Sequence, residues 1–116
     1  MKKDALKEIV AKKKEKIALA MHAVPEETLK GMVQGLPPPR PFLSAIAKPR
    51  VISRIAEIKK ASPSQGVIRG DDFNPAAIAK AYQDAGVQAI SVLTEEDHFC
   101  GKPAYLQEVK SVTTCP

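Results

Sequence analysis

The chain has 116 residues, 44% of them hydrophobic and 27% charged, which fits one soluble globular domain or a part of a larger one and excludes a disordered chain. Aromatic residues make up 4% and Trp is absent, so any core must be built from aliphatic side chains. No apolar run is long enough to cross a membrane, no secretory or transit peptide is recognisable, and Cys100 and Cys115 form no CxxC pair. We therefore expect a cytoplasmic protein with reduced thiols, no membrane contact and no metal site.

The first predicted element is a Lys-rich amphipathic helix over residues 2–22. Residues 1–17 hold seven Lys against three acidic residues, which is +4 of the net charge of +5. A basic segment can bind nucleic acid, but the interleaved Arg and aromatic residues typical of such surfaces are missing here. We interpret the lysines as a solvated helix face and expect no nucleic-acid partner.

Three short features follow the first helix. Pro25 and the two acids after it favour the start of a second helix. The run Pro37–Pro39 predicts a stiff, extended connector, and the sequence FLSAIAK predicts one or two helical turns. The sequence VISRIAEI, from Val51, then predicts the first strand.

The rest of the chain alternates between helix and strand. A helix is predicted with Asn74 as N-cap, Pro75 at its first position and Gly86 at its end. The sequence VQAISVLTE predicts a second strand, and KPAYLQEVKSV a further helix. The side chains expected to be buried on the two helices are Ile78, Ala81, Tyr82, Ala85, Tyr105, Leu106 and Val109. This order predicts an α/β fold with parallel βα units.

Polar side chains gather at the end of the first predicted strand, in the sequence IAEIKKASPSQG. Because side chains alternate across a strand, Glu57 and Lys59 share one face, while Ala56 and Ile58 take the other. Ligands and catalytic groups of parallel α/β folds lie at the carboxyl ends of the strands. The pair is therefore a candidate site, with a solvated ion pair as the equally weighted alternative.

The loop after this strand allows two interpretations. The hydroxyls in Ser-Pro-Ser and the nearby backbone donors could bind a phosphate or carboxylate. Taken alone, such a sequence is more often a turn.

Several segments together resemble the indole-3-glycerol phosphate synthase family. They are the sequences IAEIKKASPSQGVIR and DFNPAAIAKAYQDAGVQAISVLTEEDHFCG, with LKEIVAKKKEKI similar to the family's leading helix. The resemblance implies a (βα)8 TIM barrel, of which this chain carries an N-terminal part. Residues 1–50 would be a helical leader, and residues 51–116 the first two parallel βα units.

The resemblance also implies an activity and its residues. The reaction is the ring-closing decarboxylation and dehydration of carboxyphenylamino-deoxyribulose phosphate, a phosphorylated small molecule, without cofactor or metal. The matching catalytic positions are Glu57 and Lys59. The matching substrate-binding positions are Ser62, Pro63 and Phe99, the last within an aromatic pocket.

Other catalytic groups of the family lie on later strands, beyond the sequence SVTTCP. We therefore expect the 116-residue chain alone to be inactive, and to self-associate or require the rest of the barrel. Two alternatives are a small non-catalytic α/β module that binds an anion through the Ser-Pro-Ser loop, and a nucleic-acid-binding piece driven by the Lys-rich segment.

Overall fold

The computed structural model describes residues 4–116. The chain divides into two compact units, with the boundary in the sequence between Pro38 and Pro39. The first unit contains α1 (Ala5–Ala23) and α2 (Glu26–Val33), so both helices predicted for this region are confirmed. The Asp4 carboxylate caps α1 by accepting a hydrogen bond from the amide of Lys7. The predicted start of α1 at residue 2 lies outside the described residues.

The helices of the first unit are exposed. Within residues 4–38, no side chain of α1 or α2 is buried, in line with a solvated Lys-rich face. The exposed side chains include apolar ones, among them Leu6 and Ile17. None of the helices in residues 4–116 is both long enough and apolar enough to span a bilayer.

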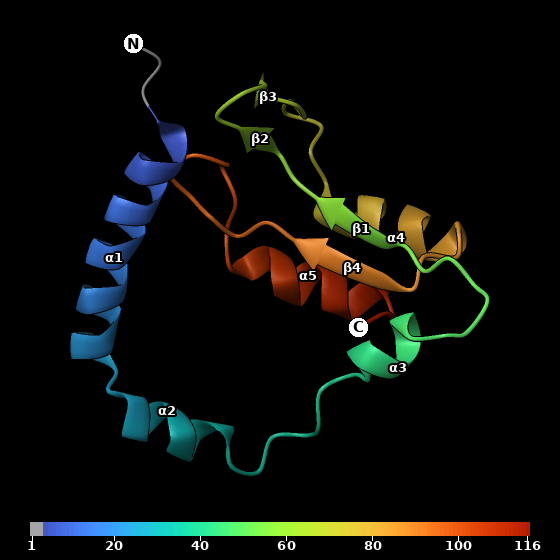
Figure 1. Cartoon of the computed structure of the whole chain (residues 1–116), viewed down its shortest axis with the longest axis horizontal. Coiled ribbons are helices and arrows are strands. Elements are labelled where there is room, and N and C mark those ends of the chain that lie inside the picture. Colours follow the sequence, from blue (N-terminus) through green and yellow to red (C-terminus); the bar gives the residue numbers. More distant parts are fainter. Residues whose placement is uncertain (1–3) are drawn as a thin grey trace. The chain divides into compact units, whose positions relative to one another are not determined.

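The second unit is a small α/β arrangement (Figure 1). It consists of α3 (Phe42–Ile46), β1 (Ile55–Ile58), β2 (Ala61–Ser62), β3 (Gly66–Val67), α4 (Pro75–Asp84), β4 (Ala89–Val92) and α5 (Ala104–Val112). Strands β1 and β4 pair in parallel, with Ile55 opposite Ala89 and Ile58 opposite Val92. The predicted parallel α/β pattern is confirmed.

Strand β1 begins four residues later than predicted. At Arg50 the backbone is left-handed, with φ at 63°, and the Ser53 hydroxyl donates a hydrogen bond to the Ile46 carbonyl at 2.7 Å. These contacts hold the segment in a turn, and the side chain of Ile52 is 89% exposed. Pairing with β4 becomes possible only beyond Arg54, whose carbonyl accepts the amide of Ala89.

Helix α4 begins and ends as its sequence predicts. The Asn74 side chain accepts a hydrogen bond from the amide of Ala77 at 3.0 Å, and Pro75 occupies the first helical position. Gly86 has a φ of 80°, which explains why a residue without a Cβ closes the helix. These short-range signals do not depend on what the helix packs against.

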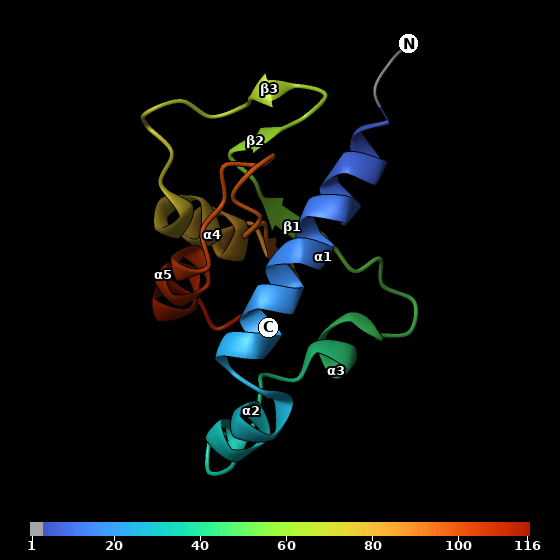
Figure 2. The same cartoon turned by 90° about the vertical axis from the view of Figure 1, so that its left-hand side faces the viewer.

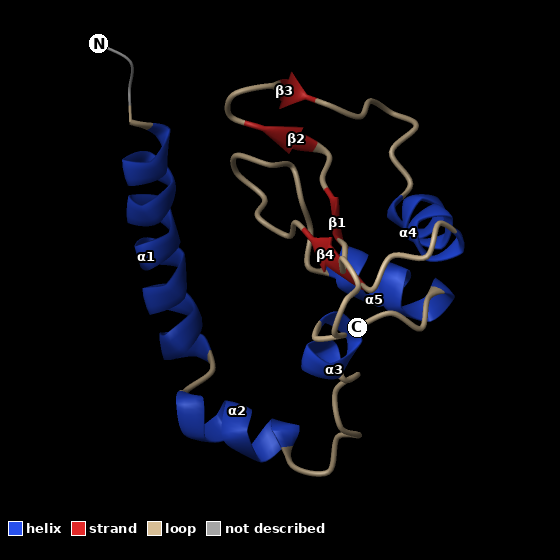
Figure 3. Ribbon diagram, turned by 45° about the vertical axis from the view of Figure 1, so that its right-hand side comes forward, coloured by secondary structure: helices blue, strands red, loops and turns tan. Residues whose placement is uncertain are grey.

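Helices α4 and α5 lie side by side on one face of the β1–β4 pair (Figures 2 and 3). The core between them contains Ile58, Ala79 and Val109. Partly buried side chains surround this cluster: Phe73, Ile78, Tyr82, Ile90 and Val92.

Three of the side chains predicted to be buried on the helices are exposed. Ala81 of α4 and Ala85, which caps the end of α4, face solvent, because the helix is turned so that Pro75 and Ala79 meet the core. Leu106 of α5 is 54% exposed, since the core contact of this helix is made by Val109 one turn later.

The Ser-Pro-Ser loop is a hairpin, which confirms the interpretation as a turn. Strands β2 and β3 pair antiparallel, with Ser62 opposite Gly66. The three residues between them form the turn, and Gly66 adopts the left-handed conformation that often follows a three-residue hairpin loop.

Candidate active site

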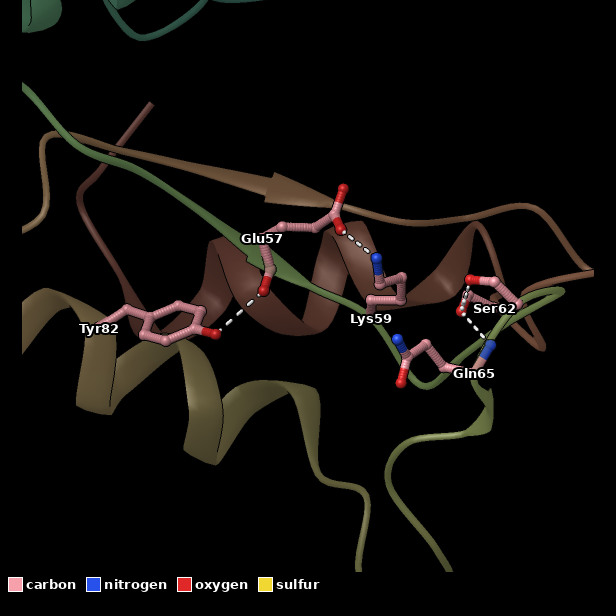
Figure 4. A network of polar contacts seen from close by, with 6 residues as sticks. Glu57, Lys59, Ser62, Gln65 and Tyr82 are labelled. Atoms are coloured by element: carbon pink, nitrogen blue, oxygen red, sulfur yellow. Dashed lines mark hydrogen bonds and ion pairs between the residues drawn. The ribbon is translucent and has the colours of Figure 1, made fainter.

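Glu57 and Lys59 lie together on the face of β1 that carries no helix (Figure 4). Their carboxylate oxygen Oε1 and ammonium nitrogen Nζ are 3.0 Å apart. Ile58, between them in sequence, is only 1% exposed and points into the core under α4 and α5. The prediction that the two charges share one face, opposite Ile58, is confirmed.

This ion pair contributes little to the stability of the fold. The side chains of Lys59 and Glu57 are 32% and 47% exposed, and ion pairs exposed to this degree are worth about 0–1 kcal/mol. The strand would keep its core contact through Ile58 without either charge. The placement of the pair at the carboxyl end of β1 therefore needs an explanation other than folding.

The hydroxyl of Tyr82 donates a hydrogen bond to the main-chain carbonyl of Glu57 at 3.0 Å (Figure 4). It ties α4 to β1 at the residue that carries the carboxylate. Helical spacing places Tyr82 on the apolar face of the helix and does not predict this contact. The available signal was the phenol itself, because a partly buried tyrosine hydroxyl usually finds a polar partner.

A cavity of about 230 Å³ lies beside the ion pair. Its lining joins the strand residues Glu57, Ile58 and Lys59 to the helix residues Ile78 and Tyr82 and to Ile68 and Arg69 after the hairpin. Two basic residues, one acidic residue and a tyrosine thus border one small space. Ser62, Pro63 and Phe99 do not line this cavity.

Ser62 and Pro63 belong to the hairpin that follows β1. The Ser62 side chain is buried, and its hydroxyl oxygen accepts a hydrogen bond from the amide of Gln65 at 3.2 Å (Figure 4). It also lies 3.4 Å from the hydroxyl oxygen of Ser64. Pro63 is exposed at the turn. The Ser62 hydroxyl is therefore engaged in shaping the loop.

Phe99 lies in the loop after β4, and Glu95 organises this loop. The Glu95 carboxylate accepts hydrogen bonds from the amides of Asp97, His98 and Phe99, at 3.1, 2.7 and 3.2 Å. Burial disfavours the charged form of Glu95, but the amide hydrogen bonds and the nearby His98 outweigh burial and hold its pKa below the ordinary value of 4.5. The sequence pattern alone indicated no role for Glu95.

The same loop returns close to β4 at Gly101. A Cβ at this position would collide with the Leu93 carbonyl oxygen and would lie 2.8 Å from the carbonyl carbon of Thr94. The amide of Gly101 donates a hydrogen bond to the Glu95 carbonyl at 2.7 Å. Only glycine fits here, so both ends of the loop that carries Phe99 are fixed.

The family model for indole-3-glycerol phosphate synthase matches residues 6–116. The chain belongs to the indole-3-glycerol phosphate synthase family. The segments that carry the resemblance, from the leading helix to the loop with Phe99, all lie within the matched range.

Individual relatives of this chain are also named indole-3-glycerol phosphate synthase. The indole-3-glycerol phosphate synthase of Geobacillus thermodenitrificans is 57% identical over 84 residues, which are 70% of this chain and 32% of the relative. That of Dechloromonas aromatica is 42% identical over 116 residues, which are 97% of this chain and 44% of the relative. The chain thus spans less than half the length of these indole-3-glycerol phosphate synthases.

Proposed function

We propose that this chain provides the first part of an indole-3-glycerol phosphate synthase built as a (βα)8 barrel. Residues 1–50 serve as the helical leader and residues 51–116 as the first two βα units. The assembled enzyme closes the indole ring of carboxyphenylamino-deoxyribulose phosphate with loss of carbon dioxide and water. The reaction belongs to tryptophan biosynthesis and takes place in the cytoplasm.

The observation that carries this proposal is the Lys59–Glu57 pair, 3.0 Å apart at the carboxyl end of β1 on the helix-free face. In a barrel that face is turned toward the interior, where substrates of this fold bind. Helices α4 and α5 already occupy the opposite face, as the outer layer of a barrel requires.

The chemistry of the pair suits ring closure. An aromatic carbon attacks a ketose carbonyl, so negative charge develops on the carbonyl oxygen and a proton must reach it. The Lys59 ammonium can donate that proton or stabilise the charge, and the Glu57 carboxylate keeps the ammonium in place. The later loss of water also needs a proton donor near the departing hydroxyl.

The remaining site residues bind rather than react. Phe99 offers an aromatic face for the anthranilate ring of the substrate, on a loop fixed by Glu95 and Gly101. Ser62 and Pro63 shape the hairpin beside the pair. The alternative of a simple anion-binding module has less support, since the Ser62 hydroxyl and the Gln65 amide bond to each other within the turn.

The test joins this chain in frame to the part of the Dechloromonas aromatica synthase that follows its match with this chain. Formation of indole-3-glycerol phosphate is followed by fluorescence. We expect turnover in the joined protein, and a loss of at least about tenfold in Lys59→Ala, because general acid–base groups contribute roughly 10²–10⁴.

Two further variants sharpen the assignment. Lys80→Ala removes an exposed ammonium from α4 and should leave turnover unchanged. Lys59→Arg keeps the positive charge but hardly releases a proton, so it separates proton donation from charge stabilisation. A joined protein that folds but has no turnover would refute the proposed activity, and equal turnover in Lys59→Ala would return the pair to a surface ion pair.

A further inference from the structure

Tyr82 joins the core of the second unit to the strand that carries the ion pair. Its ring packs against the core cluster between α4, α5 and β1. Its hydroxyl donates to the main-chain carbonyl of Glu57 at 3.0 Å (Figure 4). A tyrosine side chain turns about only two bonds, so a ring held by its neighbours leaves the hydroxyl little freedom. The donor of this hydrogen bond is therefore fixed in place.

The helix that carries Tyr82 is itself tied to the same strand. Tyr82 lies in the last turn of α4. Just beyond this turn, the Arg54 side chain donates to the Ala85 carbonyl at 3.4 Å, and the Gln88 side chain accepts the Arg54 amide at 2.7 Å. Arg54 directly precedes β1. The C-terminal end of α4 is thus held at the start of β1, and Tyr82 reaches from it toward the end of the strand.

The Glu57 carbonyl lies on the edge of β1 that faces away from β4. Successive carbonyls of a parallel strand point to opposite edges, and those of Arg54 and Ile58 accept amides at or next to the two ends of β4. The carbonyl of Glu57 therefore points to the other edge, where the Tyr82 hydroxyl meets it. A carbonyl oxygen can accept two hydrogen bonds, so this contact is compatible with a further strand on that edge.

This carbonyl belongs to the peptide group between Glu57 and Ile58. Rotation of the group would turn the Cβ atom of Glu57 relative to that of Lys59 and change the 3.0 Å between their charged atoms. Burial of Ile58 restrains one side of the group, and the Tyr82 hydroxyl restrains its oxygen. The partly exposed ion pair adds little restraint of its own.

We propose that Tyr82 is a positioning residue for the reaction proposed above: its hydroxyl holds the Glu57 peptide group, and thereby the spacing of Glu57 and Lys59. The inference rests on the proposed function and extends it from the residues that react to the helix behind them. A purely structural role predicts a different result. A tyrosine that only fills the core lowers the stability of a variant, whereas a positioning residue lowers turnover in protein that remains folded.

The test introduces Tyr82→Phe into the protein joined to the Dechloromonas aromatica part. This change keeps the ring and removes one hydroxyl. We expect kcat to fall roughly 3- to 10-fold, as the loss of one hydrogen bond allows, with KM changed by less than about twofold. Tyr105→Phe is the matched control, because it removes the hydroxyl of the chain's other tyrosine, whose ring packs against Phe73. Its kcat should equal that of the parent.

A double-mutant cycle tests whether Tyr82 acts through the ion pair. Tyr82→Phe is combined with Lys59→Ala, and kcat is measured at saturating substrate. We expect the removal of the Tyr82 hydroxyl to change kcat by less than about twofold once the Lys59 ammonium is absent, because the two changes disable the same unit. Circular dichroism and urea unfolding establish that every joined variant compared is folded.

A measurement on the 116-residue chain does not depend on turnover. The NMR resonance of the Glu57 carbonyl carbon should move upfield in Tyr82→Phe, because the carbonyl loses a hydrogen bond. The same resonance should stay in place in Tyr105→Phe. An unmoved resonance in Tyr82→Phe would overturn the contact on which the inference depends.

The kinetic outcomes separate this inference from the proposed function. Equal kcat in Tyr82→Phe and the parent, in a joined protein that responds to Lys59→Ala, would overturn the positioning role alone. The same loss of kcat with and without the Lys59 ammonium would place the action of Tyr82 outside the pair and overturn it as well. A joined parent without turnover would refute the proposed function and the positioning role with it, while a moved Glu57 resonance would still confirm the hydrogen bond.

Discussion

Removal of the Glu95 carboxylate should open the loop that carries Phe99. In the structure this carboxylate accepts three main-chain amides within four residues, and its side chain is only 12% exposed. Glu95→Ala leaves these donors without their acceptor. We therefore expect a local effect on the loop between β4 and α5.

The size of the effect follows from the hydrogen bonds lost. Leaving a buried donor unsatisfied costs about 1–3 kcal/mol, which corresponds to roughly 5- to 150-fold faster amide exchange at 25 °C. The part-buried amides of His98 and Phe99 should show this effect, and the exposed amide of Asp97 a smaller one. Glu95→Gln keeps one oxygen acceptor without the charge and should give a smaller increase.

The pH dependence has a defined sign. Because the pKa of Glu95 is lowered in the folded chain, its stabilising effect is complete at pH values above the ordinary value of 4.5. It is lost as the pH falls through the lower, folded pKa. Protection of the three amides should therefore fall in acid in the parent chain, and should lack this step in Glu95→Gln.

The control is Glu108→Ala, which removes an exposed carboxylate from α5. Exchange rates at each pH are corrected for the intrinsic rate of the unfolded chain. If the three loop amides exchange no faster in Glu95→Ala than in Glu108→Ala, the carboxylate does not hold the loop. The assigned origin of the lowered pKa would then be wrong as well.

Two further expectations concern the chain as a whole. Val109→Ala should lower the free energy of unfolding of the chain in urea by about 1.5–3 kcal/mol. Leu106→Ala, at a 54% exposed position, should lower it by less than about 1 kcal/mol. A larger loss in Leu106→Ala than in Val109→Ala would contradict the core described above. The purified chain should associate in light scattering, because half of the Ile55 side chain is exposed and, within residues 4–116, each strand of the β1–β4 pair has a strand partner on one edge only; a stable monomer would refute this claim. The chain should have no synthase turnover, because the resemblance implies further catalytic groups on strands later than β4; turnover above background would refute this expectation.

Features set by neighbours in sequence could be predicted. The Asn74 cap and Gly86 end of α4 depend on a few adjacent residues, and the shared face of Glu57 and Lys59 depends on strand alternation alone. The resemblance to the family then implied a catalytic role for Glu57 and Lys59. The residue pattern alone could not distinguish such a catalytic pair from a solvated ion pair.

Contacts between distant residues could not be predicted in this way. The hydrogen bond from Tyr82 to Glu57 joins residues 25 apart, and that from Arg40 to Cys115 joins residues 75 apart. Both depend on the way a helix or connector packs against a strand. The burial error at Leu106 has the same origin, because helical periodicity gives a face but not its rotation toward the core.

The exposure of the ion pair bears on the proposed function. At 4 Å, two unit charges interact by about 1 kcal/mol in water and about 4 kcal/mol at an effective dielectric constant of 20, so Glu57 and Lys59 influence each other weakly while half exposed. Strands added at the β4 edge would extend the sheet around the face that carries the pair and exclude water from it. The same geometry, 3.0 Å between Oε1 and Nζ, would then hold the ammonium far more firmly in place. Closure of the proposed barrel is therefore the step that would shield this ion pair from water and strengthen the interaction between its two charges.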